Sequence, residues 1–389
     1  MVIAMVRVAV LGAGPTGLEA ALAAHQRGWD AVVYEQAPHV AGHVRQWSHV
    51  RLFTPWSMNV SPRVTEAVGV PAADTCPTGA EYAAHLDRVA ALLPDVRLST
   101  TVEQVAREGL LKNEEIGSAV RGALPFRLLV TGPDGAERIE HADFVLDCTG
   151  TYSQPNPTGA GGIPAVGERA LADFIVRGIP VVDAGWAGRS VLLVGAGNSA
   201  QTVARDLAAA GAEFTWAVRR ASPTWGAVED DPLADRAALV ASSRALAAGS
   251  VPGASVLTGV VVESFAPAAD RVAVVLRGRD GALTEVVVDV VVSMTGSIGD
   301  SRLYRQLQVH ECYATEGPMT LAATLIGAEG GDCLAQSSGG VDVLRNPEPR
   351  FFVLGSKSYG RTNTFLLRVG WEQVAEVFEA LDEELLVPA

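Results

Sequence analysis

Hydrophobic and polar positions fall into the same order twice along the chain: an apolar run, a glycine-rich turn and a helical period. The first copy covers residues 6–17 and reads VRVAVLGAGPTG, followed by the helical pattern LEAALAAHQRG. The second copy covers residues 189–211, with SVLLVG leading into GAGNSA and then QTVARDLAAAG. Strand, tight glycine turn and helix in this order are typical of a dinucleotide-binding βαβ unit. The pattern therefore predicts an α/β protein with two Rossmann-like dinucleotide-binding domains.

The remaining apolar runs alternate between strand-like and helix-like periods, which extends the α/β pattern. Helices are predicted at 78–93, where Pro94 ends the pattern, and at 364–381. Strands are predicted at 96–105, 126–130, 138–146, 255–263, 271–277, 285–294 and 350–355, with a hairpin turn at 132–135. A segment rich in proline and glycine, 151–167, marks a crossover between domains.

Each glycine of the first motif meets a separate need. Gly12 permits the tight turn, Gly14 lets the backbone approach a pyrophosphate over the helix N–H groups, and Gly17 lets the helix pack on the strand. The next strand, AVVYE, ends in Glu35, where a carboxylate that binds a ribose hydroxyl is expected. A strand, turn and helix without a ligand is the alternative. The contacts predicted here are Gly12, Gly14, Pro15, Thr16, Gly17 and Glu35.

The second motif differs from the first at the end of its second strand, where EFTWAV runs into Arg219 and Arg220. A ribose 2′-hydroxyl favours a carboxylate, whereas a 2′-phosphate favours guanidinium groups, so this copy is predicted to prefer NADPH to NADH. Two solvated arginines are the alternative. Asn198 is a candidate for holding nicotinamide or a peroxide, unless it only caps the helix. The predicted contacts are Gly195, Gly197, Asn198, Ser199, Ala200, Arg219 and Arg220.

Residues 37–64 show neither a helical nor a strand period. Long aperiodic segments in compact domains are usually functional, and this one combines tryptophans, arginines and an amide that could cover the planar ring of a cofactor. A surface loop held in place by buried tryptophans is the alternative. The cofactor contacts predicted here and nearby are Gly42, Arg45, Gln46, Trp47 and Trp56, the backbone at Val102, and Thr149 and Gly150 after the strand FVLD.

Composition favours a globular protein of two or three domains, because the 389 residues are 48% hydrophobic and 19% charged. No uninterrupted apolar run reaches about 18 residues, and the apolar start leads directly into the first strand. We therefore expect no membrane span, no targeting segment and a cytoplasmic location. The net charge of −14 and the dispersed lysines and arginines argue against nucleic-acid binding.

Metal and disulfide chemistry is not indicated. The four cysteines, Cys76, Cys148, Cys312 and Cys333, are scattered without a CxxC pair and are expected to be apolar fillers. The acidic cluster at 229–231 contains groups that bind metals, but a solvated turn is the favoured interpretation. The sequence therefore predicts no metal site.

Taken in order, GAGPTG, Glu35, CTGTYSQPNP, VGAGNSA, AVRR and a later TG resemble the motifs of the two-dinucleotide flavoproteins. The resemblance is closest to the class B flavin-containing monooxygenases and their lysine and ornithine N-hydroxylase relatives. The loop GHVRQWSHVRLFTPW and the tail NPEPRFFVLGSKSYGRTNTFLLRVGWEQV look more specifically like bacterial flavoprotein monooxygenases of arsenic-resistance and biosynthetic operons. The resemblance spans nearly the whole chain.

This resemblance implies a glutathione-reductase-like plan with FAD on the first motif and NADPH on the second. Residues 1–155 and 299–389 would form a discontinuous FAD domain, and residues 156–298 an inserted NADPH domain. The C-terminal residues that it places at the flavin are Gly355, Lys357, Thr364, Phe365 and Leu366, where the dipole of the last helix favours negative charge near the reduced ring.

One class B signature, FxGxxxH before the second glycine motif, is absent, and GIPAVGERALADF stands in its place. Arg169 is a candidate to replace the histidine, and Baeyer–Villiger chemistry is disfavoured.

The implied activity is that of a FAD-dependent, NADPH-consuming monooxygenase, in which reduced FAD and O₂ form a C4a-hydroperoxide inside a water-excluding pocket. The distal oxygen would pass to a small nucleophilic substrate, with N-hydroxylation or heteroatom oxidation favoured. Asn59, Lys357 and Arg361 join Asn198 as candidates that contact the flavin or an anionic substrate. A structural role is the alternative for each.

Three other interpretations remain. A reductase of the thioredoxin-reductase type needs a redox-active cysteine pair, and this chain has no CxxC. An NADPH oxidase or a simple flavin reductase would work without oxygen insertion. A flavin-binding redox sensor would not need an intact second motif. Besides a small-molecule substrate and O₂, we expect no nucleic-acid or membrane partner, and a homodimer is left open.

Overall fold

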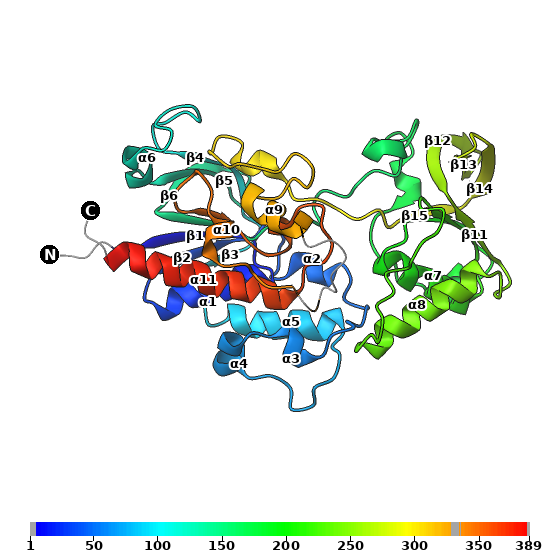
Figure 1. Cartoon of the computed structure of the whole chain (residues 1–389), viewed down its shortest axis with the longest axis horizontal. Helices are drawn as coiled ribbons and strands as arrows, with labels where there is room; N and C mark the ends of the chain where they lie inside the picture. Colours follow the sequence, from blue (N-terminus) through cyan, green and yellow to red (C-terminus); the bar gives the residue numbers. More distant parts are fainter. Residues whose placement is uncertain (1–4, 328–333, 335, 387–389) are drawn as a thin grey trace. The chain divides into compact units, whose positions relative to one another are not determined.

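The computed structural model describes residues 5–327, 334 and 336–386. The chain forms two compact units, each with a five-stranded parallel sheet and a three-stranded antiparallel sheet (Figure 1). The first unit comprises Met1–Ser48, Thr54–Gln154 and Ile298–Ala389, and the second comprises His49–Phe53 and Pro155–Ser297. The α/β class and the duplicated plan predicted from the sequence are confirmed.

In the first unit the parallel sheet has the order β16-β7-β1-β2-β3. Its strands are β1 (Arg7–Leu11), β2 (Asp30–Tyr34), β3 (Val96–Arg97), β7 (Phe144–Asp147) and β16 (Phe351–Val353). The central strands are buried on both faces, which is why they read as continuous apolar runs. The antiparallel sheet, β4 (Thr101–Arg107), β5 (Phe126–Thr131) and β6 (Glu137–Ala142), lies between β3 and β7 in the sequence.

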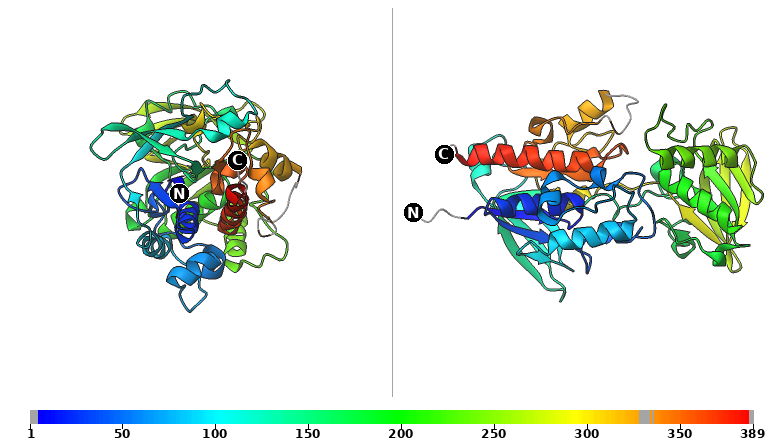
Figure 2. Two further views of the ribbon diagram at one scale, coloured as in Figure 1. Left: turned by 90° about the vertical axis from the view of Figure 1, so that its left-hand side faces the viewer. Right: turned by 90° about the horizontal axis from the view of Figure 1, so that it is seen from below.

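Helix α1 (Pro15–Gln26) links β1 to β2, and α11 (Leu367–Leu386) packs along it, as Figures 1 and 2 show. Trp29 supports this packing, since its ring lies 5.5 Å from that of Phe378 on α11. The other helices of this unit are α2 (Gly42–Arg45), α3 (Trp56–Asn59), α4 (Pro62–Val68), α5 (Gly79–Ala90), α6 (Ala119–Ala123), α9 (Met319–Gly327) and α10 (Val341–Leu344), with 3₁₀ turns η4 (Ser301–Tyr304) and η6 (Gly355–Tyr359). The predicted helix at 78–93 is confirmed as α5, which starts with a capping box between Thr78 and Glu81.

The second unit repeats this plan with the parallel order β11-β10-β9-β15-β8. Its parallel strands are β8 (Ile175–Val176), β9 (Ser190–Val194), β10 (Glu213–Val218), β11 (Ala254–Thr258) and β15 (Val290–Ser293). Its antiparallel strands are β12 (Val260–Ala268), β13 (Arg271–Gly278) and β14 (Leu283–Val288). Helices α7 (Asn198–Ala210) and α8 (Ala234–Ala247) pack side by side, and the 3₁₀ turns are η1 (Ala160–Gly162), η2 (Ala172–Phe174) and η3 (Ala184–Trp186).

The chain enters and leaves the larger segment of the second unit, residues 155–297, at two adjoining backbone positions. Pro155 and Ser297 form a β-bridge in the second unit, and the N–H of Ile298 donates to the carbonyl of Gln154 in the first, at 2.9 Å. The boundaries that we propose from the sequence, 155/156 and 298/299, each lie within one residue of these positions. The grouping of His49–Phe53 with the second unit was not predicted.

Four apolar runs that the sequence predicts as single strands are each two strands in different sheets. The run at 96–105 divides at Ser99, which has a φ of +48°, and the run at 255–263 divides at Gly259, with a φ of +73°. The runs at 138–146 and 285–294 divide at Asp143 and Asp289. These predictions were wrong because a single residue turns the chain into another sheet without interrupting the apolar pattern.

Asp143 and Asp289 make the same pair of contacts in the two units. The N–H of Asp143 donates to the carbonyl of Arg7, whose own N–H donates to Asp143 Oδ2 at 2.9 Å. The N–H of Asp289 donates to the carbonyl of Ser190, whose N–H donates to Asp289 Oδ2 at 2.8 Å. Each aspartate thus ties the start of a returning parallel strand to the first residue of the central strand, β1 or β9.

Two further predictions of secondary structure need correction. Residues 37–64 contain α2, α3 and the start of α4, which are too short to show a helical period. The last helix starts at Leu367 and reaches Leu386, so Thr364, Phe365 and Leu366 form the loop before it. No helix in the described ranges is both long and apolar enough to cross a membrane.

Candidate dinucleotide-binding sites

The first glycine turn connects β1 to α1 and lies beside Cys148, the residue that follows β7. Gly12 has a φ of +98°, and a Cβ there would lie 2.8 Å from the carbonyl oxygen of Cys148. A Cβ at Gly17 would lie 1.9 Å from the carbonyl oxygen of Gly12. A Cβ at Gly14, in contrast, would meet no atom of the described chain within 4 Å. Packing therefore requires glycine at positions 12 and 17, whereas Gly14 borders open space that suits a ligand.

The N-terminus of α1 is left uncapped by side chains. Gly14 is its N-cap and supplies no side-chain hydrogen bond, and Pro15 occupies the first helical turn. The neighbouring helices α4 and α5 are capped by the hydroxyls of Ser61 and Thr78. Uncapped N–H groups and the positive end of the helix dipole favour an anionic group such as a pyrophosphate.

Glu35 is held rigidly beside the turn. Its Oε2 accepts from the N–H of Ala13 at 2.8 Å, and its Oε1 accepts from the N–H of Ala37 at 2.9 Å. The carboxylate lines a pocket of about 270 Å³ that contains four predicted FAD contacts. The pocket is lined by Glu35, Gln36, Ala37, His39, Gly42, His43, Arg45 and Gln46. The structure thus brings together residues that the sequence placed on separate elements.

His43 is a member of this pocket that sequence reasoning missed. Its ring stacks on that of Tyr152 with 5.6 Å between centroids, close to Gly150. Burial lowers the pKa of His43, and the carboxylate of Glu35 partly opposes this effect. Its position directly after Gly42 in the predicted cofactor segment is the signal that could have pointed to it.

The C-terminal segment approaches α1 closely. Gly355 has a φ of +71°, and a Cβ there would lie 2.7 Å from Thr16 Oγ1. The hydroxyls of Tyr359 and Thr364 are buried and have no hydrogen-bond partner in the part of the chain that the structure describes. Buried hydroxyls normally find partners, so two orphaned ones close to the predicted flavin contacts fit a bound polar cofactor. Phe365 packs edge-on against Tyr359, with 5.4 Å between ring centroids.

Lys357 is buried and fully engaged by the protein. Its Nζ donates to Asp147 Oδ2 at 2.5 Å, to Thr149 Oγ1 at 3.0 Å and to the carbonyl of Asp300 at 2.9 Å. Thr149 in turn donates through its N–H and its hydroxyl to Asp147 Oδ1. All three ammonium protons are satisfied, so Lys357 holds the end of β7, where Gly150 follows, instead of presenting a charge to a ligand.

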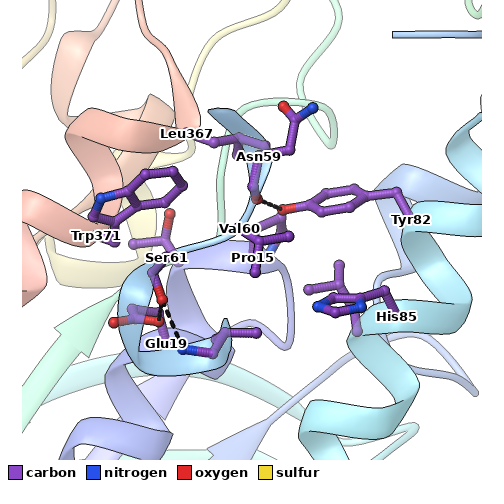
Figure 3. Close-up of a pocket in the computed structure, with 12 residues that line it drawn as sticks. Pro15, Glu19, Asn59, Val60, Ser61, Tyr82, His85, Leu367 and Trp371 are labelled. Carbon is purple, nitrogen blue, oxygen red and sulfur yellow. Dashed lines mark hydrogen bonds between the residues drawn. The ribbon is translucent and has the colours of Figure 1, made fainter. Parts of the chain in front are cut away.

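Asn59 also lies beside the first turn, in the pocket shown in Figure 3, but its amide is used within its own loop. Its Nδ2 donates to the carbonyls of Thr54 and Pro55, and its Oδ1 accepts from Thr54 Oγ1 at 2.8 Å. The backbone carbonyl of Asn59 accepts a hydrogen bond from the hydroxyl of Tyr82, as Figure 3 shows. The pocket is lined by Pro15, Thr16, Glu19, Asn59, Val60, Ser61, Val64, Tyr82, His85, Leu86, Leu367 and Trp371.

Two predicted cofactor contacts, Trp47 and Trp56, pack against α5; Trp56 is buried, whereas Trp47 is partly exposed. Trp47 lies against the start of α5, because a Cβ at Gly79 would meet its ring at 2.7 Å. Trp56 packs beneath α5, with its ring 5.2 Å from that of His85. These contacts hold the segment against α5.

Three further predicted residues lie on the sheet or the surface of the first unit. Val102 lies on β4 at a β-bulge and packs against the core. Arg45 binds Asp87 with one guanidinium nitrogen, and Arg361 binds Glu316 at an exposed site. Both guanidinium groups are therefore paired with carboxylates of the protein.

The second glycine turn reproduces the geometry of the first. Gly195 has a φ of +124°, and a Cβ there would lie 2.2 Å from the carbonyl oxygen of Met294. A Cβ at Gly197 would meet nothing within 4 Å in the described chain. Gly197 is the N-cap of α7, without a side-chain hydrogen bond. This turn therefore also borders space that suits a ligand phosphate.

Asn198 is the first residue of α7, so the alternative that it caps the helix is wrong. The cap fails because Gly197 already takes the extended conformation of the N-cap. Asn198 and Ser199 are exposed on the open side of the turn, whereas Ala200 is fully buried.

Arg219 and Arg220 follow the end of β10, and both are exposed. Within the described residues neither guanidinium forms an ion pair with a carboxylate, although most other arginines of the chain do. Two unpaired cations beside a ligand-ready glycine turn fit the 2′-phosphate of NADPH. Arg169, the candidate replacement for the missing histidine, is exposed in the same unit.

The acidic cluster at 229–231 is tied to a neighbouring helix. Asp231 accepts from Arg236 at 2.7 Å, and the pKa of its carboxyl is lowered by that bond. Among the described residues, no group of histidine, cysteine and acidic side chains is arranged to hold a metal ion. Cys148 and Cys312 are free thiols, and Cys333 lies outside the described residues.

Two Rossmann-like units with ligand-ready glycine turns define an oxidoreductase that uses two dinucleotides. A family model for the pyridine nucleotide-disulphide oxidoreductases matches residues 6–313, and the chain belongs to this family. Membership of this family makes the chain an oxidoreductase of the kind that uses a pyridine nucleotide. The resemblance to two-dinucleotide flavoproteins that the sequence motifs indicated is confirmed.

Known proteins of several activities are similar to this chain. Indole-3-pyruvate monooxygenase YUCCA1 from Oryza sativa subsp. japonica is 28% identical over 214 residues, which cover 54% of this chain and 47% of that protein. The chain thus spans about half the length of this curated relative. Bacillithiol disulfide reductase Bdr (YpdA) from Bacillus cereus has a TM-score of 0.71 at 18% identity, covering 98% and 99% of the two chains. A flavin-containing monooxygenase from Stenotrophomonas maltophilia has a TM-score of 0.61 at 22% identity, covering 97% and 100%.

Proposed function

We propose that this protein is an FAD-dependent, NADPH-consuming monooxygenase that oxygenates a small nucleophilic substrate. The observation that carries the proposal is the pair of open glycine turns with opposite electrostatics. The first is joined to a carboxylate, Glu35, and the second to two unpaired cations, Arg219 and Arg220. Two different dinucleotides suit these two sites, one retained and one exchanged during turnover.

FAD is assigned to the first unit. Its pyrophosphate would lie over the uncapped start of α1 at Gly14, and its ribose at Glu35. The orphaned hydroxyl of Thr364 supports placing the flavin end at the loop before α11. The full proposed set is Gly12, Gly14, Pro15, Thr16, Gly17, Glu35, Gly42, Arg45, Gln46, Trp47, Trp56, the backbone at Val102, Thr149, Gly150, Gly355, Thr364, Phe365 and Leu366.

NADPH is assigned to the second unit. Its pyrophosphate would lie over the start of α7 at Gly197, and its 2′-phosphate between Arg219 and Arg220. Asn198 would hold the nicotinamide end from its exposed position. The full proposed set is Gly195, Gly197, Asn198, Ser199, Ala200, Arg219 and Arg220.

FAD, when bound, accepts a hydride from NADPH and passes electrons to O₂, so that one oxygen atom reaches the substrate and the other leaves as water. The chain itself contributes binding, orientation and exclusion of water. Lys357 and Asp147 fix the backbone at Thr149 and Gly150, which we assign to the flavin. Because no strong acid or base is needed for attack by a soft nucleophile, N-hydroxylation or heteroatom oxidation is the proposed reaction class.

A disulfide reductase is the main competing function within this family. Such an enzyme needs a reactive thiolate, but burial and the adjacent Asp147 raise the pKa of Cys148, the cysteine nearest the first glycine turn. This environment favours the oxygenase over a reductase that uses Cys148. The proposal extends to a biosynthetic role in the cytoplasm, which rests on the resemblance to monooxygenases of biosynthetic operons.

The proposal is tested by reducing the purified holoenzyme with NADPH without oxygen and then admitting ¹⁸O₂ together with a panel of amines and thioethers. We expect a transient near-ultraviolet species, followed by products that carry one ¹⁸O atom. Stoichiometric peroxide without labelled product would identify an oxidase and overturn the monooxygenase. Reduction of a disulfide panel without oxygen consumption would identify a reductase.

A further inference from the structure

The second glycine turn is held from behind by two buried side chains. Trp216 on β10 donates its Nε1–H to the carbonyl of Gly195 at 2.7 Å. Gln201 on α7 donates through Nε2 to the carbonyl of Ala196 at 3.3 Å. Both side chains are buried, with exposed fractions of 0% and 1%. The carbonyls of this turn therefore point into the protein, which leaves its open face to the ligand.

The first glycine turn is held differently. There the N–H of Ala13 donates to Glu35, and the carbonyl of Ala13 accepts from the N–H of Ala41 at 3.0 Å. A carboxylate fixes the first turn, whereas neutral donors fix the second. The neutral support keeps a carboxylate away from the second site, whose proposed ligand carries one phosphate more than the ligand of an acid-ended site.

Gln201 also reaches the segment that follows the two arginines. Its Nε2 lies 3.0 Å from the carbonyl of Trp225, to which it donates. Its Oε1 lies 2.9 Å from the hydroxyl oxygen of Ser243 on α8, a side chain with no exposed surface. One buried amide thus connects the glycine turn, the segment after β10 and a second helix.

Trp225 is held in an unfavourable backbone conformation. Its φ is +61°, in the left-handed region that bulky side chains rarely adopt because it is energetically unfavourable for them. Its ring is buried and lies 4.7 Å from that of Trp216. The strain persists because Gln201 and Trp216 hold both the backbone and the ring. Since Trp225 follows Arg220 by only a few residues, this anchor limits where the arginines can lie.

We infer that Gln201 is a positioning residue that couples the second glycine turn to the arginine pair and so determines the preference for a 2′-phosphorylated dinucleotide. Gln201 does not contact the ligand; it acts through Ala196 on one side and Trp225 on the other. The inference rests on the proposed assignment of NADPH to Arg219 and Arg220.

The test uses the holoenzyme and two fragments of the dinucleotides, adenosine 2′,5′-bisphosphate and 5′-AMP, titrated by calorimetry. Gln201→Met keeps the length of the side chain but removes every hydrogen bond. We expect it to weaken binding of the bisphosphate about tenfold or more, and binding of 5′-AMP less than about threefold. Ser243→Ala removes the hydroxyl that contacts Gln201 Oε1 but leaves the two hydrogen bonds donated by Gln201 Nε2. It should shift the ratio of the two affinities, for the bisphosphate and for 5′-AMP, by a smaller factor. Ser242→Ala, on the same helix, is the matched control and should not shift it.

The outcomes separate this inference from the proposed function. If the unmodified protein binds both fragments equally, the NADPH assignment fails. If it prefers the bisphosphate but Gln201→Met weakens both fragments equally or neither, the coupling is wrong and the assignment stands. In an Arg219→Ala/Arg220→Ala background, Gln201→Met should change the ratio little, because no cations remain to be positioned. Should Gln201→Met not fold, the ratio measured with Ser243→Ala decides, since an unchanged ratio overturns the coupling.

Discussion

The ammonium of Lys357 lies 2.5 Å from the carboxylate of Asp147, and neither side chain has more than 3% of its surface exposed. The pair joins η6, in the C-terminal segment, to the end of β7, far away in the sequence. It sits directly behind Thr149, which both residues contact through hydrogen bonds. A buried ion pair at this point makes the position of the proposed flavin contacts depend on two distant parts of the chain.

Removing one member of this pair should destabilise the first unit strongly. Lys357→Met leaves the carboxylate of Asp147 buried without its partner, a change that typically costs about 3–5 kcal/mol. We expect a lower melting temperature and loss of FAD on gel filtration. The double variant Asp147→Asn/Lys357→Met should recover part of the stability, because no charge remains buried. Arg361→Ala, which breaks an exposed pair with Glu316, is the control and should cost less than about 1 kcal/mol. If Lys357→Met and Arg361→Ala lowered the stability equally, the buried ion pair would contribute no more than an exposed one.

The two open glycines should separate the two cofactors. Gly14→Ala adds a Cβ that meets no atom of the described chain, so we expect folding with a stability loss below about 1 kcal/mol but at least tenfold weaker FAD binding. Gly197→Ala should keep the bound FAD and raise the KM for NADPH by at least about tenfold. Absorbance of bound flavin and steady-state kinetics read the two effects independently. Loss of FAD in Gly197→Ala would contradict the assignment of the two motifs.

The arginine pair should decide between the two nicotinamide dinucleotides. Arg219→Ala/Arg220→Ala removes the proposed partners of the 2′-phosphate, so the KM for NADPH should rise about ten- to a hundredfold while that for NADH changes little. Arg205→Ala, an exposed arginine on α7 that pairs with Asp206, is the matched control. An unchanged preference in the double variant would refute the assignment.

The stability of the first unit should depend on pH through His85. Burial, and to a lesser extent the charge of Arg88, lower the pKa of this histidine below its usual 6.5. The unfolded chain therefore binds a proton at His85 more readily than the folded chain does. The free energy of unfolding is highest above about pH 6.5 and falls as the pH drops below that value, by at most about 1.4 kcal/mol per pH unit. Urea denaturation at pH 7.5 and 5.5 measures this loss. His85→Leu should flatten the dependence, whereas His25→Gln, at an exposed position, should leave it unchanged. A dependence that His85→Leu does not alter would assign the effect to other groups.

The fold followed from the sequence where the apolar pattern is interrupted by residues with strong backbone preferences. Local signals of this kind mark the glycine turns at Gly12 and Gly195 and the capped start of α5 at Thr78. The elements that these three signals predict are present. The pattern failed at Asp143 and Asp289, because an aspartate that binds the first residue of a central strand is a long-range contact. No window of neighbouring residues contains that information.

The candidate sites divide in the same way. Glu35, at the end of β2, and Gly42 and Gln46, in the segment without a period, line one pocket. The polar side chains of Asn59 and Lys357 form hydrogen bonds with other groups of the protein. Only the three-dimensional structure shows these partners. His43 and Gln201 were not predicted, because a pocket neighbour and a buried amide have no motif of their own. Residue type indicates what a side chain can bind, but packing determines which partner it finds.

Pro155 pairs with Ser297, and Gln154 with Ile298, so the segment of residues 155–297 begins and ends at adjoining backbone positions, as a short turn does. A flexible connection of the same length would have to be closed at an entropic cost that grows with every added residue. A folded insert whose ends already meet imposes almost none of that cost. During evolution such an insert can be exchanged or can change its nucleotide preference without penalty to its host, so one flavin-binding scaffold can be inherited with different sources of electrons.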